Sequence, residues 1–123
     1  FGGLDFLSDF EEKIVVHPKS GELPADAVSR AAIKKLRKLN GRPFLLWVHF
    51  FETHDWFTWS GRTWADAWTH PVESYDAVLH RLDPAVGRLT DFLKKSGLMD
   101  RSIIVMTGDH GEALGYRGFR THS

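Results

Sequence analysis

The stretch IIVMTGDHG, residues 103–111, joins a short apolar run to a polar turn. An unbroken apolar run of this kind favours a strand that is covered on both faces. Asp109 and His110 follow the run at once, and Gly108 and Gly111 let the backbone turn so that both side chains aim at one point. A carboxylate beside an imidazole suits Mn²⁺, Zn²⁺ or Fe²⁺, and can serve a harder cation with more oxygen ligands. Catalytic sites usually need a third protein ligand, so the dipeptide alone favours an ordinary polar turn.

A second apolar run, FLLWVHFF at residues 44–51, precedes a polar loop that contains His54. In open α/β sheets ligands gather beyond the carboxyl ends of strands, and both polar segments lie at such ends. His54 could donate a hydrogen bond to an anionic ester oxygen or protonate a leaving group. A loop histidine bonded to a neighbouring carboxylate explains it equally well. His49, inside the apolar run, is interpreted as a core histidine.

Two amphipathic segments alternate with these apolar runs. Apolar residues at spacings of three and four predict a helix that begins at Pro24 and stops at Asn40-Gly41. A second helix is expected from about Pro71. Pro84 could start a separate helix with Asp83 as its N-cap, but the apolar face keeps one phase across it, which favours one helix kinked at Pro84. Helix, strand, helix and strand in succession indicate an α/β fold with a parallel sheet.

Residues 52–70 are expected to form a loop, and four of the five tryptophans fall there. These side chains could cap a site, stack on an aromatic or sugar substrate, or pack in a core against a segment that lies outside this chain. Arg117 and Arg120 could meet an anion, although solvated positions explain them at least as well.

The composition excludes several classes of protein. A chain of 123 residues with 42% hydrophobic content can bury a core, and its formal net charge of zero argues against nucleic-acid binding. There is no cysteine, hence no disulfide, and no apolar run long enough to cross a bilayer. Nothing in the sequence indicates a compartment.

The order of these features resembles the sulfatase family of the alkaline-phosphatase-like superfamily. Similarity is closest in residues 103–115, which resemble the second metal-binding motif of that superfamily, and it extends through residues 44–56 and 75–93. The resemblance implies that residues 1–123 are an incomplete part of one catalytic domain, a three-layer α/β/α sandwich.

The resemblance also implies the chemistry of the site. Asp109 and His110 would be ligands of a divalent cation, usually Ca²⁺ in sulfatases, with Mn²⁺ or Zn²⁺ as alternatives. His54 would contact the sulfate or phosphate group, and His122 would lie near the substrate. The expected reaction is hydrolysis of a small-molecule or glycan sulfate ester through a covalent intermediate on the nucleophile. Alternatives are a phosphodiesterase, phosphonate hydrolase or phosphotransferase of the same superfamily, and a non-catalytic aromatic-rich binding module.

Three features depart from the family pattern. No cysteine or serine begins the Cys/Ser-x-Pro-x-Arg nucleophile motif, and the first metal aspartates are missing as well, so this chain alone should bind metal poorly and should not turn over. Tyr116 and Arg117 stand where glutamate and histidine are usual. Glu52-Thr53 replaces the usual aspartate and proline before His54.

Overall fold

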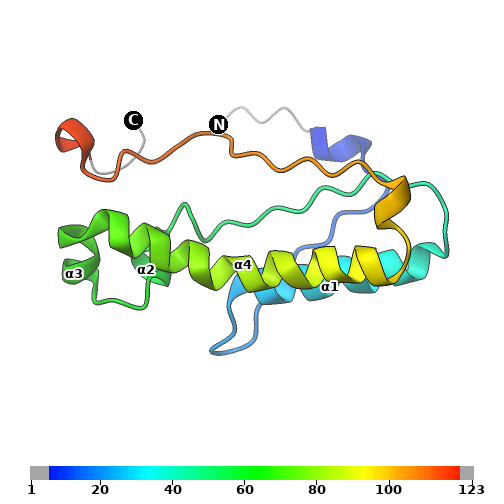
Figure 1. Ribbon diagram of the computed structural model, residues 1–123, viewed down its shortest axis with the longest axis horizontal. Coiled ribbons are helices and arrows are strands. Elements are labelled where there is room, and N and C mark those ends of the chain that lie inside the picture. The colour runs from blue at the N-terminus through cyan, green and yellow to red at the C-terminus, as the bar shows by residue number, and fades with distance from the viewer. Residues whose placement is uncertain (1–5, 120–123) are drawn as a thin grey trace.

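A computed structural model describes residues 6–119 of the chain. Four α-helices carry the described fold: α1 (Pro24–Leu39), α2 (Trp56–Trp59), α3 (Trp64–Thr69) and α4 (Pro71–Lys95). Three short 3₁₀ turns, η1 (Phe6–Asp9), η2 (Met99–Arg101) and η3 (Tyr116–Gly118), lie in the connecting segments. Figure 1 shows α1 and α4 side by side along the longest axis, with α2 and α3 at one end.

The pairing of α1 with α4 is the scaffold of the molecule. The predicted start of α1 at Pro24 is confirmed, and so is its stop, where Asn40 (φ 47°) and Gly41 (φ 80°) adopt left-handed backbone. Small side chains line the contact between the helices, and the hydroxyl of Ser29 donates a hydrogen bond to the carbonyl of Ala85. Both residues are fully buried, so the two backbones approach closely.

Helix α4 runs through Pro84 without interruption, as predicted. Its buried residues are Ser74, Val78, Ala85 and Leu93, whereas Leu79 is 42% exposed. The helix therefore meets α2 and α3 through Val78, meets α1 at Ala85, and leaves part of its apolar surface uncovered.

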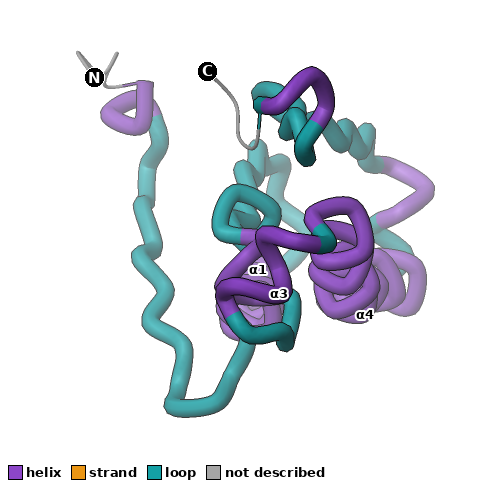
Figure 2. The backbone as a smooth tube through the Cα atoms, turned by 90° about the vertical axis from the view of Figure 1, so that its left-hand side faces the viewer, coloured by secondary structure: helices purple, strands orange, loops and turns teal. Residues whose placement is uncertain are grey.

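The predicted α/β architecture, part of a three-layer α/β/α sandwich, is wrong for the described residues, because residues 6–119 form helices and loops and contain no β-strand (Figure 2). Residues 44–51 and 103–107 are drawn out, but no backbone hydrogen bond joins one segment to the other. Leu45 is 82% exposed and Ile103 is 95% exposed. An apolar run favours extended backbone, but a strand also requires a neighbour that returns its hydrogen bonds.

The region 52–70 is also more ordered than the predicted loop, since it contains α2 and α3. Thr63 caps α3 by accepting a hydrogen bond from the amide of Asp66 at 3.2 Å. Trp56, Ala67 and Val78 form a buried cluster that joins α2, α3 and α4. This aromatic core holds the loop that follows His54 against the start of α4.

The two drawn-out segments lie on the same side of the α1–α4 pair in both Figure 1 and Figure 2. Their polar ends, which carry His54 and Asp109, therefore extend over the same helical platform. None of the helices in residues 6–119 combines the length and the apolar character that crossing a membrane would require.

Candidate active site

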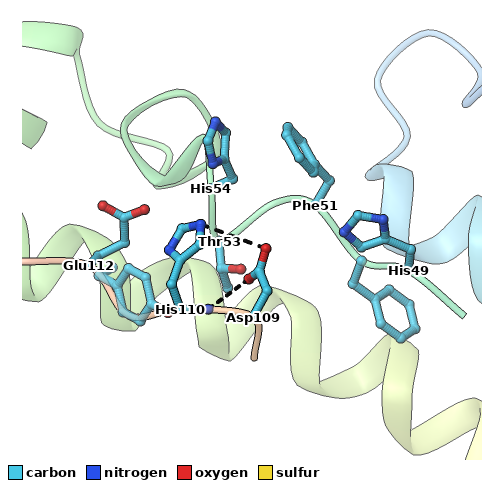
Figure 3. Close-up of a pocket in the computed structure, with 9 residues that line it drawn as sticks. His49, Phe51, Thr53, His54, Asp109, His110 and Glu112 are labelled. Atoms are coloured by element: carbon cyan, nitrogen blue, oxygen red, sulfur yellow. Dashed lines mark hydrogen bonds and ion pairs between the residues drawn. The ribbon is translucent and has the colours of Figure 1, made fainter. Parts of the chain in front are cut away.

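A small open pocket lies where the two drawn-out segments end. Its walls come from three parts of the chain: the segment before α2, the first turns of α4, and the turn after residue 107. Figure 3 shows imidazole, carboxylate and aromatic side chains around this hollow. The lining residues are His49, Phe50, Phe51, Thr53, His54, Tyr75, Asp109, His110 and Glu112.

The Asp109-His110 pair is organised by its own backbone. One carboxylate oxygen of Asp109 accepts a hydrogen bond of 3.0 Å from the amide of His110, and the other lies 3.6 Å from His110 Nε2 (Figure 3). The backbone amides of Asp109 and His110, with smaller help from the imidazoles of His110 and His49, hold the pKa of the Asp109 carboxyl below its usual value. Asp109 therefore remains ionised over a wider range of pH.

A second contact orients the His110 ring. Nδ1 of His110 lies 3.1 Å from the carbonyl oxygen of Gly111, and because a carbonyl can only accept, Nδ1 is the donor in this contact. Nε2 faces the carboxylate of Asp109, so the two side chains form an ion pair when the imidazole is protonated. Donation from one ring nitrogen to a backbone carbonyl is also a common way of orienting histidines that bind metal ions.

His54 reaches the same pocket from a tight turn. Its amide donates a hydrogen bond of 3.1 Å to the carbonyl of Phe51, and its ring lies with its centroid 4.6 Å from that of Phe51. The side chain is exposed on the pocket wall. The structure thus brings His54 together with Asp109 and His110 although they are far apart in the sequence.

Sequence reasoning missed His49 and Glu112. His49 was interpreted as a core residue, which is wrong, because it is exposed and lines the pocket. The sequence did contain a signal for His49. Side chains alternate between two sides in extended backbone, so residues 49, 51 and 53 lie on one side of the segment. Glu112 had a weaker signal, its position two residues after His110.

The pocket residues supply only some of the ligands that a bound cation would need. Carboxylate and imidazole atoms converge in the pocket, but within residues 6–119 no three His, Cys, Asp or Glu side chains are grouped closely enough to hold a metal ion. These residues can therefore supply two ligands of a metal site, Asp109 and His110, and a complete coordination shell needs further donors.

The three remaining predicted contacts have different outcomes. His122 and Arg120 lie outside the described residues, so both stay predictions. Arg117 places its guanidinium carbon 5.3 Å from the centre of the Tyr116 ring and is not among the pocket-lining residues.

The tryptophans serve mainly as a core. Trp56 is fully buried, and its ring lies edge-on to Trp68 at 5.1 Å between centroids. Trp59 and Trp68 pack partly buried against the same cluster, and no tryptophan lines the pocket. The loop tryptophans thus pack in a core made by this chain itself, which none of the three predicted roles described, and Trp64, at 65% exposure, is the exception.

Imidazoles and carboxylates in one hollow are the groups with which hydrolases handle anionic esters. The chain matches the Sulfatase family over residues 5–123, and it therefore belongs to the sulfatase family of ester hydrolases. No curated protein and no solved structure matches the chain.

Proposed function

We propose that this chain is part of the catalytic domain of a metal-dependent sulfuric ester hydrolase. The observation that carries the proposal is the meeting of His54, Asp109 and His110 in one pocket. Membership of the sulfatase family supports the reaction class, because sulfate esters are the substrates that this family implies.

Charge in the pocket argues for a bound cation. Asp109 and Glu112 are both carboxylates, and the lowered pKa of Asp109 keeps its charge in place. An anionic ester would be repelled by these charges unless a cation offset them. Asp109 and His110 are the residues that we expect to hold it: Ca²⁺ as the usual sulfatase ion, Mn²⁺ or Zn²⁺ as alternatives that suit the imidazole. Such an ion supplies charge stabilisation to the group being transferred.

We assign His54 the role of contacting the ester group of the substrate. Its position on the opposite wall from the Asp109-His110 turn (Figure 3) suits a hydrogen bond to an ester oxygen or protonation of the leaving group. His122 is proposed as a second substrate contact, on the strength of its place after the metal motif.

The nucleophile is proposed to come from residues other than 1–123. The sequence has neither a cysteine nor a serine in the family's nucleophile motif, and a cation would need more ligands than Asp109 and His110. We therefore expect this chain to be one portion of a single catalytic domain, inactive when isolated.

The test uses the full-length protein that contains these residues, assayed with p-nitrophenyl sulfate and with p-nitrophenyl phosphate. We expect the sulfate ester to be preferred, and Asp109→Ala to lower kcat/KM by roughly 10³-fold, equivalent to several kcal/mol of lost charge stabilisation. The matched control is Asp100→Ala, an exposed carboxylate outside the pocket, which should leave turnover unchanged.

Other outcomes separate the alternatives. Preference for the phosphate ester with the same loss in Asp109→Ala would favour phosphate chemistry in the same superfamily, and bis-p-nitrophenyl phosphate and a p-nitrophenyl phosphonate would then distinguish a phosphodiesterase or phosphonate hydrolase from a phosphotransferase. Hydrolysis of neither ester, or equal turnover in Asp109→Ala and wild type, would reject the hydrolase assignment and leave a binding module.

A further inference from the structure

We propose that Glu52 is a positioning residue that fixes His54 by tying its turn to the N-terminus of α1. The inference deepens the proposed function, since it rests on His54 acting in the pocket. Glu52 was noted in the sequence only as a replacement for the usual aspartate.

Glu52 is a buried carboxylate in the turn that precedes α2, and among the buried polar residues that the structure describes the others are serines. Only 3% of the residue is exposed, whereas the neighbouring Phe51 is 52% exposed. One carboxylate oxygen accepts a hydrogen bond from the amide of Ala25, and the other accepts one of 3.1 Å from the amide of Phe51. Taking a carboxylate out of water is costly, so both bonds are needed to offset its burial.

The contact with α1 supplies a cap that the helix otherwise lacks. The residue before the helix is Leu23, which has no side-chain group to accept a hydrogen bond, and Pro24 has no amide hydrogen. Ala25 therefore presents the first unpaired amide of the helix, where a negative charge is also favoured by the helix dipole. The Glu52 carboxylate fills this place from a distant part of the chain.

The second contact passes directly into the turn that carries His54. The amide of Phe51 donates to the Glu52 carboxylate, and the carbonyl of Phe51 accepts from the amide of His54. The Phe51 ring also lies against the His54 ring. Helix α1 is itself joined to α4 by the hydrogen bond between Ser29 and Ala85. The turn that carries His54 is therefore connected, through Glu52, to the packed pair of helices.

A mere helix cap and a positioning residue predict different results. A cap that only stabilises the fold would change activity by the same factor whatever residue stands at position 54. A positioning residue changes activity only through His54, so its effect disappears when the imidazole is absent.

The first test is amide hydrogen exchange in Glu52→Ala and Glu52→Gln. We expect the Ala25 amide to be protected in the wild type, to lose protection in Glu52→Ala, and to keep part of it in Glu52→Gln, whose amide oxygen can still accept one bond. The control is Glu73→Ala, an exposed acid in the first turn of α4. An Ala25 amide that exchanges equally fast in wild type and Glu52→Ala would overturn the inference.

The second test is a double-mutant cycle in the full-length protein with p-nitrophenyl sulfate. Glu52→Ala should lower kcat by roughly 10²-fold, the effect of misplacing a catalytic group by about 1 Å. In a His54→Ala background the same change should have little further effect. If Glu52→Ala folds poorly, Glu52→Gln takes its place in the double-mutant cycle.

The outcomes separate the two proposals. An equal loss from Glu52→Ala in both backgrounds overturns the positioning role but leaves the hydrolase assignment intact. A His54→Ala enzyme as active as the wild type rejects the role assigned to His54, and with it the inference. His80→Ala, an exposed imidazole on α4 outside the pocket, is the control and should keep full activity.

Discussion

The hydroxyl of Ser29 donates a hydrogen bond of 2.6 Å to the backbone carbonyl of Ala85, and through it α1 is joined to α4. This contact sets the platform on which the pocket is built. Helix α1 presents its first amide to Glu52 in the turn of His54, and α4 contributes Tyr75 to the pocket wall.

The Ser29 contact predicts a size-dependent loss of stability. Ser29→Ala removes one buried hydrogen bond and should lower the free energy of unfolding by about 1 kcal/mol. Ser29→Val also adds bulk where the backbones approach, so it should cost roughly 1–3 kcal/mol more. Urea unfolding measures both, with the exposed Ser20→Ala as control. Equal stability of the alanine and valine variants would contradict a close-packed contact.

The two long helices, α1 and α4, were predictable from the sequence, whereas α2, α3 and the lack of pairing between the extended segments were not. The alternation of apolar and basic residues in α1 requires only local geometry, and the helix begins and ends where Pro24 and Asn40-Gly41 indicate. The runs 44–51 and 103–107 indicate extended backbone, but a sheet depends on neighbours that no local pattern specifies. The same assumption of a covered strand misplaced His49 in the core.

The site was predictable as far as residue chemistry goes. The place of Asp109, His110 and His54 after apolar runs made them candidates, and the family resemblance gave them their predicted roles. The structure gathers these three residues in one pocket, and their roles stay predictions. Glu52 was not recognised as a structural link because its partner, the amide of Ala25, is a long-range contact. No spacing rule connects a carboxylate to a backbone amide on a distant helix.

The aromatic core predicts that the size of Trp56 matters more than its indole nitrogen. Trp56 is fully buried, and within the described residues its Nε1 has no hydrogen-bond partner. Trp56→Ala should cost about 3–5 kcal/mol of stability. Trp56→Phe should cost clearly less, because it keeps much of the packing and removes an unsatisfied donor. Thermal and urea unfolding compare the two; equal losses would mean that the ring is not packed as described.

The pair of Glu22 and Arg30 predicts a pH dependence. The Arg30 side chain and then the amide of Lys19 lower the pKa of Glu22 from 4.5 to about 2. A depressed folded-state pKa stabilises the protein above the unfolded-state value, and this stabilisation is lost as pH falls from about 4.5 toward about 2. Its size should be small, because Arg30 is 57% exposed and solvent screens the pair.

The measurement is the difference in unfolding free energy between wild type and Glu22→Gln. That difference should be present at pH 7 and should vanish by pH 2, and it should shrink in high salt. A difference that stays constant across this range would contradict the ionic contact.

The most direct test of the site is Mn²⁺-induced broadening of histidine ring signals in the full-length protein, labelled with ¹³C-histidine. A cation held by Asp109 and His110 should broaden the ring signals of His110, His54 and His49 more strongly than those of His17 and His80, which do not line the pocket. Asp109→Ala should abolish the selective broadening, and Ca²⁺ should compete with it. Broadening that is uniform over all histidines, or that survives in Asp109→Ala, would contradict a shared cation-binding pocket.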